Sequence, residues 1–251
     1  ILPLVATAQW WKVTRPEDVW LFQVGMSADL SMVMHSADIV LPQAPTCCVG
    51  YTTAQSFGPA ISAFIRQEVT KTFRLTLRGT FAPYSGTFET DENIFVSGAT
   101  EGVTRHTLDA RMSWLGGEFL VDVRLFDPMR LMLGISAGIM TQPTFTQEET
   151  LIVPGTGTFE NGRRVRNETV NTEMTGLTSP QLGAVIGLGY DIPLTENHSV
   201  VLTPEVLYTI GLSDIVEGQD WKANMLRVGA SIALSLNAPE PPTPVERRRE
   251  E

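Results

Sequence analysis

The chain has 251 residues, of which 43% are hydrophobic and 18% are charged, and its formal net charge is −10. The charged fraction is below the roughly 25% of an average soluble domain, and the acidic balance argues against nucleic acid as a partner, because phosphate binding needs a concentrated basic surface. No segment approaches the roughly 18 consecutive apolar residues of a transmembrane helix. Any crossing of a membrane therefore has to use strands, which can cross only as a closed barrel.

The chain begins with a short segment, residues 1–8, that ends in Ala-Thr-Ala. This ending is typical of a signal peptide, with processing before Gln9, and a short ordered segment is the alternative. The next segment carries the clearest pattern of the sequence. Every second residue from Trp20 to Met34 is apolar, and the residues between them are mostly small or polar. Such alternation predicts one long strand with a single apolar face, as in a strand that crosses a bilayer at a tilt.

The same alternation recurs along the chain and predicts an all-β protein with eight strands. We expect them at about residues 18–35, 55–67, 72–84, 104–125, 130–142, 179–192, 199–212 and 221–236. The connections alternate between three tight turns and four longer loops at 36–54, 85–103, 143–178 and 213–220. Short periplasmic turns and long extracellular loops are typical of an antiparallel up-and-down transmembrane β-barrel. In the fourth strand the apolar face changes phase, which predicts a β-bulge near Trp114 and Leu115.

The polar faces of these strands carry interleaved charges of both signs, which suit a narrow lumen filled by side chains. The predicted lumen network is Asp29, Arg66, Arg74, Arg78, Asp109, Arg111, Glu118, Asp122, Arg124, Glu205 and Arg227. Aromatic residues near the strand ends predict interfacial girdles; they are Trp20, Phe73, Phe81, Tyr84, Phe126, Tyr190, Tyr208 and Trp221. The alternative is a soluble, lipocalin-like ligand-binding barrel, whose apolar face would point inward.

The barrel is predicted to occupy residues 9–236, after which the composition changes. Residues 237–251 form a Pro-rich spacer followed by a mixed-charge run, which we interpret as a linker toward a periplasmic domain. A disordered tail is the alternative. The longest loop, 142–178, contains two segments that could extend the flanking strands as a hairpin above the membrane. It is the best candidate for contact with a surface partner.

The architecture over residues 18–236 and the loop segments 41–48, 88–94 and 159–162 (LPQAPTCC, FETDENI and FENG) resemble a known group. The chain is similar to small outer-membrane barrels of the OmpA/OmpX type, and more closely to barrel proteins of Bacteroidetes- and Chlorobi-like bacteria. The resemblance implies a location in the bacterial outer membrane, among its lipid and lipopolysaccharide. In such proteins a peptidoglycan-binding domain often follows the barrel, which implies a periplasmic or peptidoglycan contact through the linker.

The residues that could carry chemistry are few and scattered. Cys47 and Cys48 are adjacent, so in an oxidising exterior we expect a strained vicinal disulfide that stiffens the first long loop. His35 and His106 fall near the predicted outer rim, but no nucleophile and base accompany them in a recognisable arrangement. We therefore expect no enzyme activity, no cofactor and no metal site. The sequence favours a structural or anchoring barrel, and a small pore is the rival hypothesis.

Overall fold

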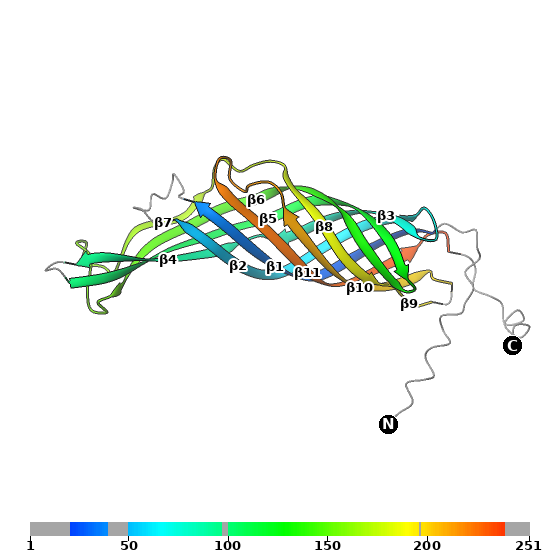
Figure 1. Cartoon of the computed structure of the whole chain (residues 1–251), viewed down its shortest axis with the longest axis horizontal. Helices are drawn as coiled ribbons and strands as arrows, with labels where there is room; N and C mark the ends of the chain where they lie inside the picture. Colours follow the sequence, from blue (N-terminus) through cyan, green and yellow to red (C-terminus); the bar gives the residue numbers. More distant parts are fainter. Residues whose placement is uncertain (1–20, 40–49, 97–99, 196, 239–251) are drawn as a thin grey trace, which may run out of the picture.

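The computed structural model describes residues 21–39, 50–96, 100–195 and 197–238. Four earlier expectations lie outside this part of the chain: the segment 1–8, Trp20 of the aromatic girdle, the pair Cys47 and Cys48, and the linker beyond residue 238. Within the described residues the protein is built from strands (Figure 1). These residues include no helix that is long and apolar enough to cross a membrane.

Eight antiparallel strands close into a ring, as the alternation predicts. They are β1 (Phe22–Ile39), β2 (Tyr51–Glu68), β3 (Phe73–Pro83), β5 (Thr100–Phe126), β6 (Met129–Val153), β8 (Gln181–Tyr190), β10 (Val200–Gly211) and β11 (Asp220–Ser235). Each pairs with the next in this order, and β11 returns to β1, where Ile232 lies opposite Met26. Closure leaves no unpaired sheet edge in the ring, which is the condition for a sheet to cross a bilayer.

Three further strands lie outside the ring order: β4 (Gly86–Val96), β7 (Val165–Glu173) and β9 (Ile192–Pro193). After a break at Tyr84 and Ser85, β4 continues the direction of β3 and pairs with the first half of β5. The second half of β6 pairs with β7. Together β4, β5, β6 and β7 form a sheet that projects beyond the ring (Figure 1), which we call the extension. The predicted hairpin within 142–178 is thus present, whereas the predicted loop 85–103 is largely strand.

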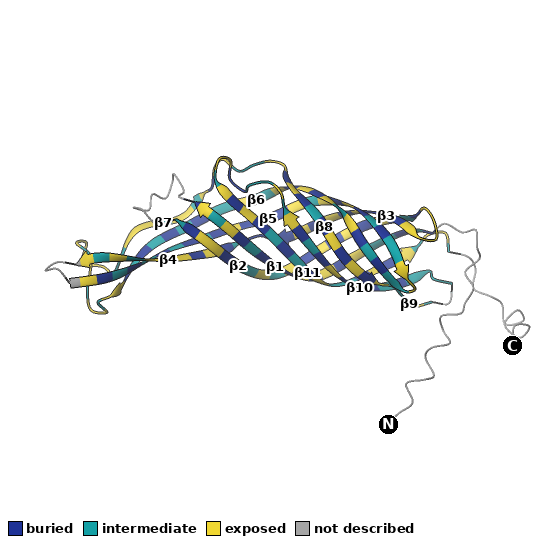
Figure 2. Cartoon of the chain, in the orientation of Figure 1, coloured by how far each residue is buried: buried dark blue, intermediate teal, exposed yellow. Residues whose placement is uncertain are grey.

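The outer surface of the ring is apolar on every strand. Outward side chains such as Met26, Leu77, Ile135 and Val228 are exposed, whereas their inward neighbours are buried, so the two classes alternate along each ribbon (Figure 2). An exposed apolar belt around a closed ring is a lipid-facing surface. It excludes the soluble, lipocalin-like alternative, which needs the apolar face inside.

The aromatic girdle is present only in part. Phe73, Phe81, Phe126 and Tyr190 are exposed near the strand ends. The prediction was wrong for Tyr84 and Trp221, which are buried inside the ring. The girdle was predicted from closeness to the strand ends. Tyr84 and Trp221 do lie near strand ends, but their side chains are on the inward face of the strand.

The strand β5 keeps one phase from Gly102 to Asp122, so the predicted bulge near Trp114 is wrong. Trp114 and Glu118 both point inward, whereas Leu115 and Phe119 point outward. The apolar face changes because β5 leaves the bilayer: inside the membrane apolar side chains face lipid, and above it they face the core of the barrel. The pairing of β5 with β6 shifts register at three places, and the shift nearest Trp114 has its extra residue in β6. Between the pairs Arg111–Thr144 and Ser113–Thr141, β6 holds one extra residue, and Gln142 has a positive φ of 52°.

The strand β7 lies at an edge of the extension and is irregular. Its pairing with β6 shifts register twice, and Asn167 and Asn171 adopt positive φ angles of 52° and 46°. Asparagine tolerates this left-handed conformation better than most residues because its short amide bonds locally with the backbone. The result is a short, twice-interrupted edge strand.

Candidate functional site: the filled lumen and its outer cap

The middle of the lumen is crossed by two buried ion pairs. Arg78 Nη1 lies 2.7 Å from Glu205 Oε1, and Arg78 Nη2 donates to Glu205 Oε2 over 3.0 Å. Arg227 Nη2 donates to Glu118 Oε1 over 2.5 Å. All four side chains have no solvent exposure. Because these residues come from β3, β5, β10 and β11, the pairs bridge the lumen from one wall to another.

A second layer of charge lies toward the short turns. Arg74 donates to Asp122 over 2.7 Å and to Asp191 over 3.0 Å, and Arg130 donates to the same Asp191 over 2.6 Å. Asp191 follows β8 directly, so its carboxylate closes the end of the lumen at which the turns lie. This layer and the middle layer together fill the inner half of the barrel with charge-assisted hydrogen bonds.

One aromatic side chain separates the two layers. Phe64 points inward, and the guanidinium carbons of Arg66 and Arg78 lie 4.5 Å and 5.5 Å from its ring centroid. Both are cation–π distances. Gly25 is paired directly with Phe64, and a side chain at Gly25 would overlap the Phe64 ring. The glycine therefore provides the space into which the phenyl ring folds.

The structure places eight of the predicted network residues inside the barrel: Asp29, Arg66, Arg74, Arg78, Glu118, Asp122, Glu205 and Arg227. Arg124 lies at the rim, where it bonds Asp127 of the adjacent turn. The prediction was wrong for Asp109 and Arg111, which bond each other on the outside of the extension. That part of β5 lies above the belt, so its outward face is polar.

Sequence reasoning missed three members of the inner network, Glu68, Arg130 and Asp191. All three lie at the ends of strands, where a charge is also expected in a solvated turn. The signal that could have found them is their position in phase with the inward face of each strand, since Arg130 and Glu68 continue the alternation of Met132 and Arg66.

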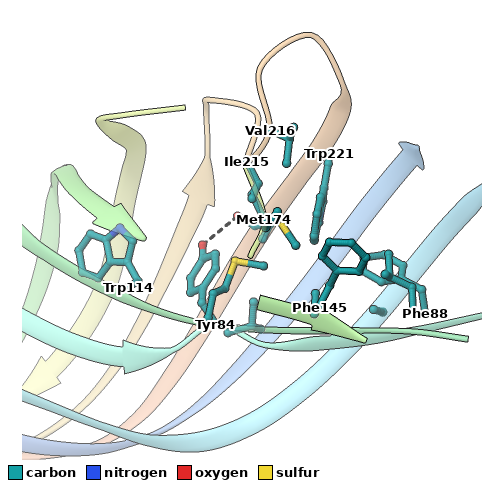
Figure 3. Close-up of a cluster of buried hydrophobic side chains, with 14 of the residues drawn as sticks. Tyr84, Phe88, Trp114, Phe145, Met174, Ile215, Val216 and Trp221 are labelled. Atoms are coloured by element: carbon teal, nitrogen blue, oxygen red, sulfur yellow. Dashed lines mark hydrogen bonds between the residues drawn. The ribbon is translucent and has the colours of Figure 1, made fainter. Parts of the chain in front are cut away.

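The outer half of the lumen is apolar, in contrast to the inner half. A cluster of buried side chains fills it, including Tyr84, Trp114, Phe145, Met174 and Trp221 (Figure 3). The segments 174–178 and 212–219, which we call the cap, cover this cluster from outside and insert Ile215 and Val216 into it. Below the cap the structure leaves a cavity of only about 20 Å³, which is room for about one water molecule.

One histidine is buried in this apolar region. His35 is surrounded by the rings of Tyr84, Phe88 and Trp221, at centroid distances of 5.8–6.0 Å. The indole N–H of Trp221 donates to His35 Nδ1 over 3.1 Å, and His35 Nε2 lies 2.9 Å from the carbonyl oxygen of Ser85. A carbonyl can only accept, so Nε2 carries the proton and the ring is neutral. His35 was predicted to lie near the outer rim. The structure buries it, and there it holds Trp221 and the Ser85 carbonyl group in place.

A polar cluster fastens the two halves of the extension. The buried carboxylate of Glu149 on β6 accepts two hydrogen bonds from Arg166, at 2.8 and 2.6 Å, and one from Asn167, at 2.8 Å. Nearby, His106 Nε2 lies 3.0 Å from Glu92 Oε2. Burial alone would raise the pKa of Glu149, but the hydrogen bonds and charge of Arg166 outweigh burial and hold that pKa below its ordinary value.

Replacing Glu149 with glutamine should release β7 from β6. We expect a cost of about 1.5 kcal/mol, the lower end for hydrogen bonds to a charged group, because Arg166 is half-exposed. Since the pKa of Glu149 is depressed in the fold, wild type should keep this stability above about pH 4.5, the ordinary value, and lose it as the pH falls further. Hydrogen exchange of residues 165–173 measures both effects. Equal exchange in E149Q and the matched surface variant E148Q would contradict the assignment.

The described residues contain no group of three or more His, Cys, Asp or Glu side chains placed to hold a metal ion. His106 and Glu92 are joined to each other, and Glu149 is occupied by Arg166. These side chains therefore join neighbouring strands to one another and are not placed together as ligands of a metal ion.

Comparisons with known proteins give likeness of fold. No protein-family model matches the sequence, and no curated protein matches it. Among solved structures the chain is similar to Neisserial surface protein A (13% identity, 86% of this chain and 97% of that chain, TM-score 0.36). It is also similar to the outer membrane protein OprG from Pseudomonas aeruginosa (13%, 86% and 97%, TM-score 0.40) and to the outer membrane protease OmpT from Escherichia coli (7%, 90% and 100%, TM-score 0.39).

These identities and TM-scores are low, so the assignment of the fold rests on the strand pairing and burial of the chain itself. The ring closes between β1 and β11, its outer belt is apolar, and its inner half is charged. Only a membrane-spanning barrel has its apolar surface outside a charged and closed interior. The chain is an eight-stranded, integral membrane β-barrel.

Proposed function

We propose that this barrel is a sealed structural module that anchors a periplasmic element to the outer membrane. The observation that carries the proposal is the filled lumen. Two layers of ion pairs occupy its inner half, and an apolar cluster under the cap occupies its outer half. A continuous water path is what a pore needs, whereas the cavity below the cap, of about 20 Å³, has room for about one water molecule.

The anchoring part of the proposal is supported by where the chain leaves the ring. The last ring strand, β11, ends beside the start of β1, where the Asn237 side-chain oxygen accepts a hydrogen bond from the Phe22 amide. This is the end at which the short turns lie. The sequence beyond Leu236 is rich in proline, a composition typical of linkers between domains. The proposed partners at this end are a periplasmic domain or peptidoglycan, reached through residues 237–251.

The outward end supports a second role in surface contact. The extension projects beyond the ring, and within it the predicted partner loop 142–178 is a pinned hairpin rather than a loose connection (Figure 1). A rigid element binds a partner at a smaller entropic cost than a mobile loop does. Lipid surrounds the belt, and lipopolysaccharide is the proposed neighbour at the outer leaflet. We assign no catalytic activity to the chain.

Single-channel recording tests the sealed lumen. The full chain, reconstituted into planar bilayers, should show no conductance steps at neutral pH, because Arg78 and Arg227 stay paired across the lumen. The variant R78S/E205S/R227S/E118S removes both ion pairs in the middle of the lumen. It is the control in which the inner half of the lumen is opened. Regular steps from the wild-type chain would support the rival hypothesis, a small pore, and reject the sealed one.

The anchoring role needs its own measurement. Cells that express the full chain and cells that express a chain ending at Ala238 should both carry a folded barrel in the outer membrane, since the ring is complete by Ser235. We expect only the full chain to be retained with the peptidoglycan fraction after mild detergent extraction. Equal retention of both chains would contradict an anchor in residues 239–251.

A further inference from the structure

The cap over the outer lumen is held by a small number of polar contacts. Within the cap, the Glu217 amide donates to the Gly176 carbonyl oxygen and the Thr178 amide to that of Ile215, over 2.8 and 3.0 Å. Toward the barrel, Gln181 donates to the carbonyl oxygens of Thr178 and Asp214, and the Ile215 amide donates to that of Trp221. The last contact links the cap to the backbone of Trp221, and His35 accepts from the indole of the same residue. Trp221 is therefore both an anchor of the cap and the partner of the histidine.

His35 can hold Trp221 only in its neutral form. The indole N–H is a donor without acceptor capacity, so His35 Nδ1 must offer a lone pair to it. The other ring nitrogen already donates to the Ser85 carbonyl oxygen. Protonation at Nδ1 would place an N–H directly against the indole N–H, at a separation of 3.1 Å between the nitrogens. The two donors would repel, and the contact would be lost.

The surroundings of His35 offer an imidazolium no counter-charge. The ring faces Tyr84 from the β3–β4 junction, Phe88 from β4, Trp221 from β11 and, across the β1–β2 pair, Ala54. Tyr84 is the titratable group among them, and its hydroxyl is already bonded to the Ala223 carbonyl oxygen; Tyr51 lies behind Phe88. The nearest charges on the adjoining strands, Asp38, Asp220 and Lys222, are exposed on the opposite face. The positive charge of Arg227 acts on Tyr84 from deeper in the lumen.

We propose that the cap is an acid-opened lid and that His35 is its sensor. At neutral pH the histidine accepts from Trp221 and the cap is closed. In acid the protonated ring releases the indole of Trp221, the Ile215–Trp221 contact loosens, and the cap (residues 212–219 and 174–178) swings away from the mouth. Opening stops at the ion pairs of Arg78 and Arg227, which lie deeper and involve no histidine. The apolar cluster in the outer half of the lumen becomes accessible from outside, and the inner half stays sealed.

The size and sign of the effect follow from proton linkage. His35 follows Met34, the last lipid-facing apolar residue of β1, and the outward residues beyond it, Ser36 and Asp38, are polar, so the histidine lies above the membrane-crossing part. Burial lowers the pKa of His35 to about 4, against an ordinary value of 6.5. A lowered pKa in the closed form means that closure is favoured above pH 6.5 and weakens as the pH falls toward 4. The closing equilibrium should shift by about a hundredfold between pH 7 and pH 4.

Hydrogen exchange on the full chain in micelles tests the lid. After correction for the intrinsic pH dependence of exchange, protection of the cap residues 212–219 and 174–178 should fall by about a hundredfold between pH 7 and pH 4. Protection of the deeper positions 226–232 should change little. The variant His35→Gln keeps a neutral acceptor and donor at both pH values, so its cap should lose most of this pH dependence. His198→Gln, in the turn at the other end of the barrel, is the matched control and should behave as wild type.

Two results would overturn the proposal. One is an equal loss of protection in acid in H35Q and wild type, which would place the sensor elsewhere. The other comes from the wild-type chain alone, so it holds even where H35Q does not fold. The imidazole resonance of His35 should titrate at the same midpoint as the loss of cap protection, and a ring that stays neutral after the cap has opened would refute its role.

Discussion

Replacing Glu118 with glutamine is expected to destabilise the barrel by about 3–5 kcal/mol, the cost of leaving one partner of a buried ion pair uncompensated. Arg227 and Glu118 have no solvent exposure, and no other carboxylate lies within ion-pair distance of the Arg227 guanidinium among the described residues. The neutral amide leaves a full positive charge inside the lumen. Equilibrium unfolding in urea, followed by the mobility difference between folded and unfolded barrel on a gel, measures the loss.

The control for this variant lies one strand away. Asp29 is also buried, but within the described residues its carboxylate is bonded by the Ser27 hydroxyl and by no arginine. Asp29→Asn removes a charge without leaving an arginine unpaired, so its cost should be well below that of E118Q. The double variant E118L/R227M, which removes both charges, should recover much of the lost stability. A cost for D29N equal to that of E118Q would mean that the pairing pattern does not govern stability.

Introducing arginine at Ile135 is expected to cost about 2–4 kcal/mol, the range for a charge at the middle of the bilayer. Ile135 lies near the centre of the membrane-crossing part of β6, and 64% of its side chain is exposed on the outer belt. The charge would contact acyl chains. Folding into lipid vesicles, with the fraction folded measured against urea concentration, reports this cost.

The matched control is Thr146→Arg, which places the same side chain on the outward face of the same strand above the belt. We expect T146R to cost less than about 1 kcal/mol, as charges near or beyond the interface do. If the two arginines cost the same, the belt would not be lipid-facing, and the assignment of the outer surface would have to be abandoned.

The ring could be predicted from the sequence because its physical cause is local. In a strand that crosses a membrane, the apolar residues of an alternating pattern face lipid and the polar residues face the lumen. In β3, Leu75 and Leu77 face lipid, and Arg74 and Arg78 face the lumen. The positions of the eight strands and the end at which the short turns lie follow from this alternation and from loop length. Proline within a strand removes a ladder hydrogen bond, and β10 contains Pro204. It lies in β10 at a position that pairs only with β11, between the segments that pair with β9 and with β8, so its missing amide hydrogen leaves no described ladder bond unmade.

The outer half could not be predicted because alternation does not mark where the membrane ends. Above the belt the same inward face changes from Arg78 to Tyr84 and Phe88 without any change of period. For the same reason Asp109 and Arg111 were assigned to the lumen although they lie on the outward face of β5. The change of phase near Trp114 was interpreted as a bulge in β5, whereas the extra residue lies across the sheet at Gln142 in β6. The position of the extra residue depends on how β5 pairs with β6. The pattern of one strand alone does not contain that information.

The irregular strand β7 has a consequence for a crowded cell surface. A regular exposed strand can recruit an equal strand from a neighbouring molecule, and repetition of that step builds aggregates. The positive φ angles of Asn167 and Asn171 interrupt the extended backbone twice within the nine residues of β7. No stretch of β7 then presents the evenly spaced amides and carbonyls that zippering of two molecules requires, so many copies can stand side by side in one membrane without fusing along this strand.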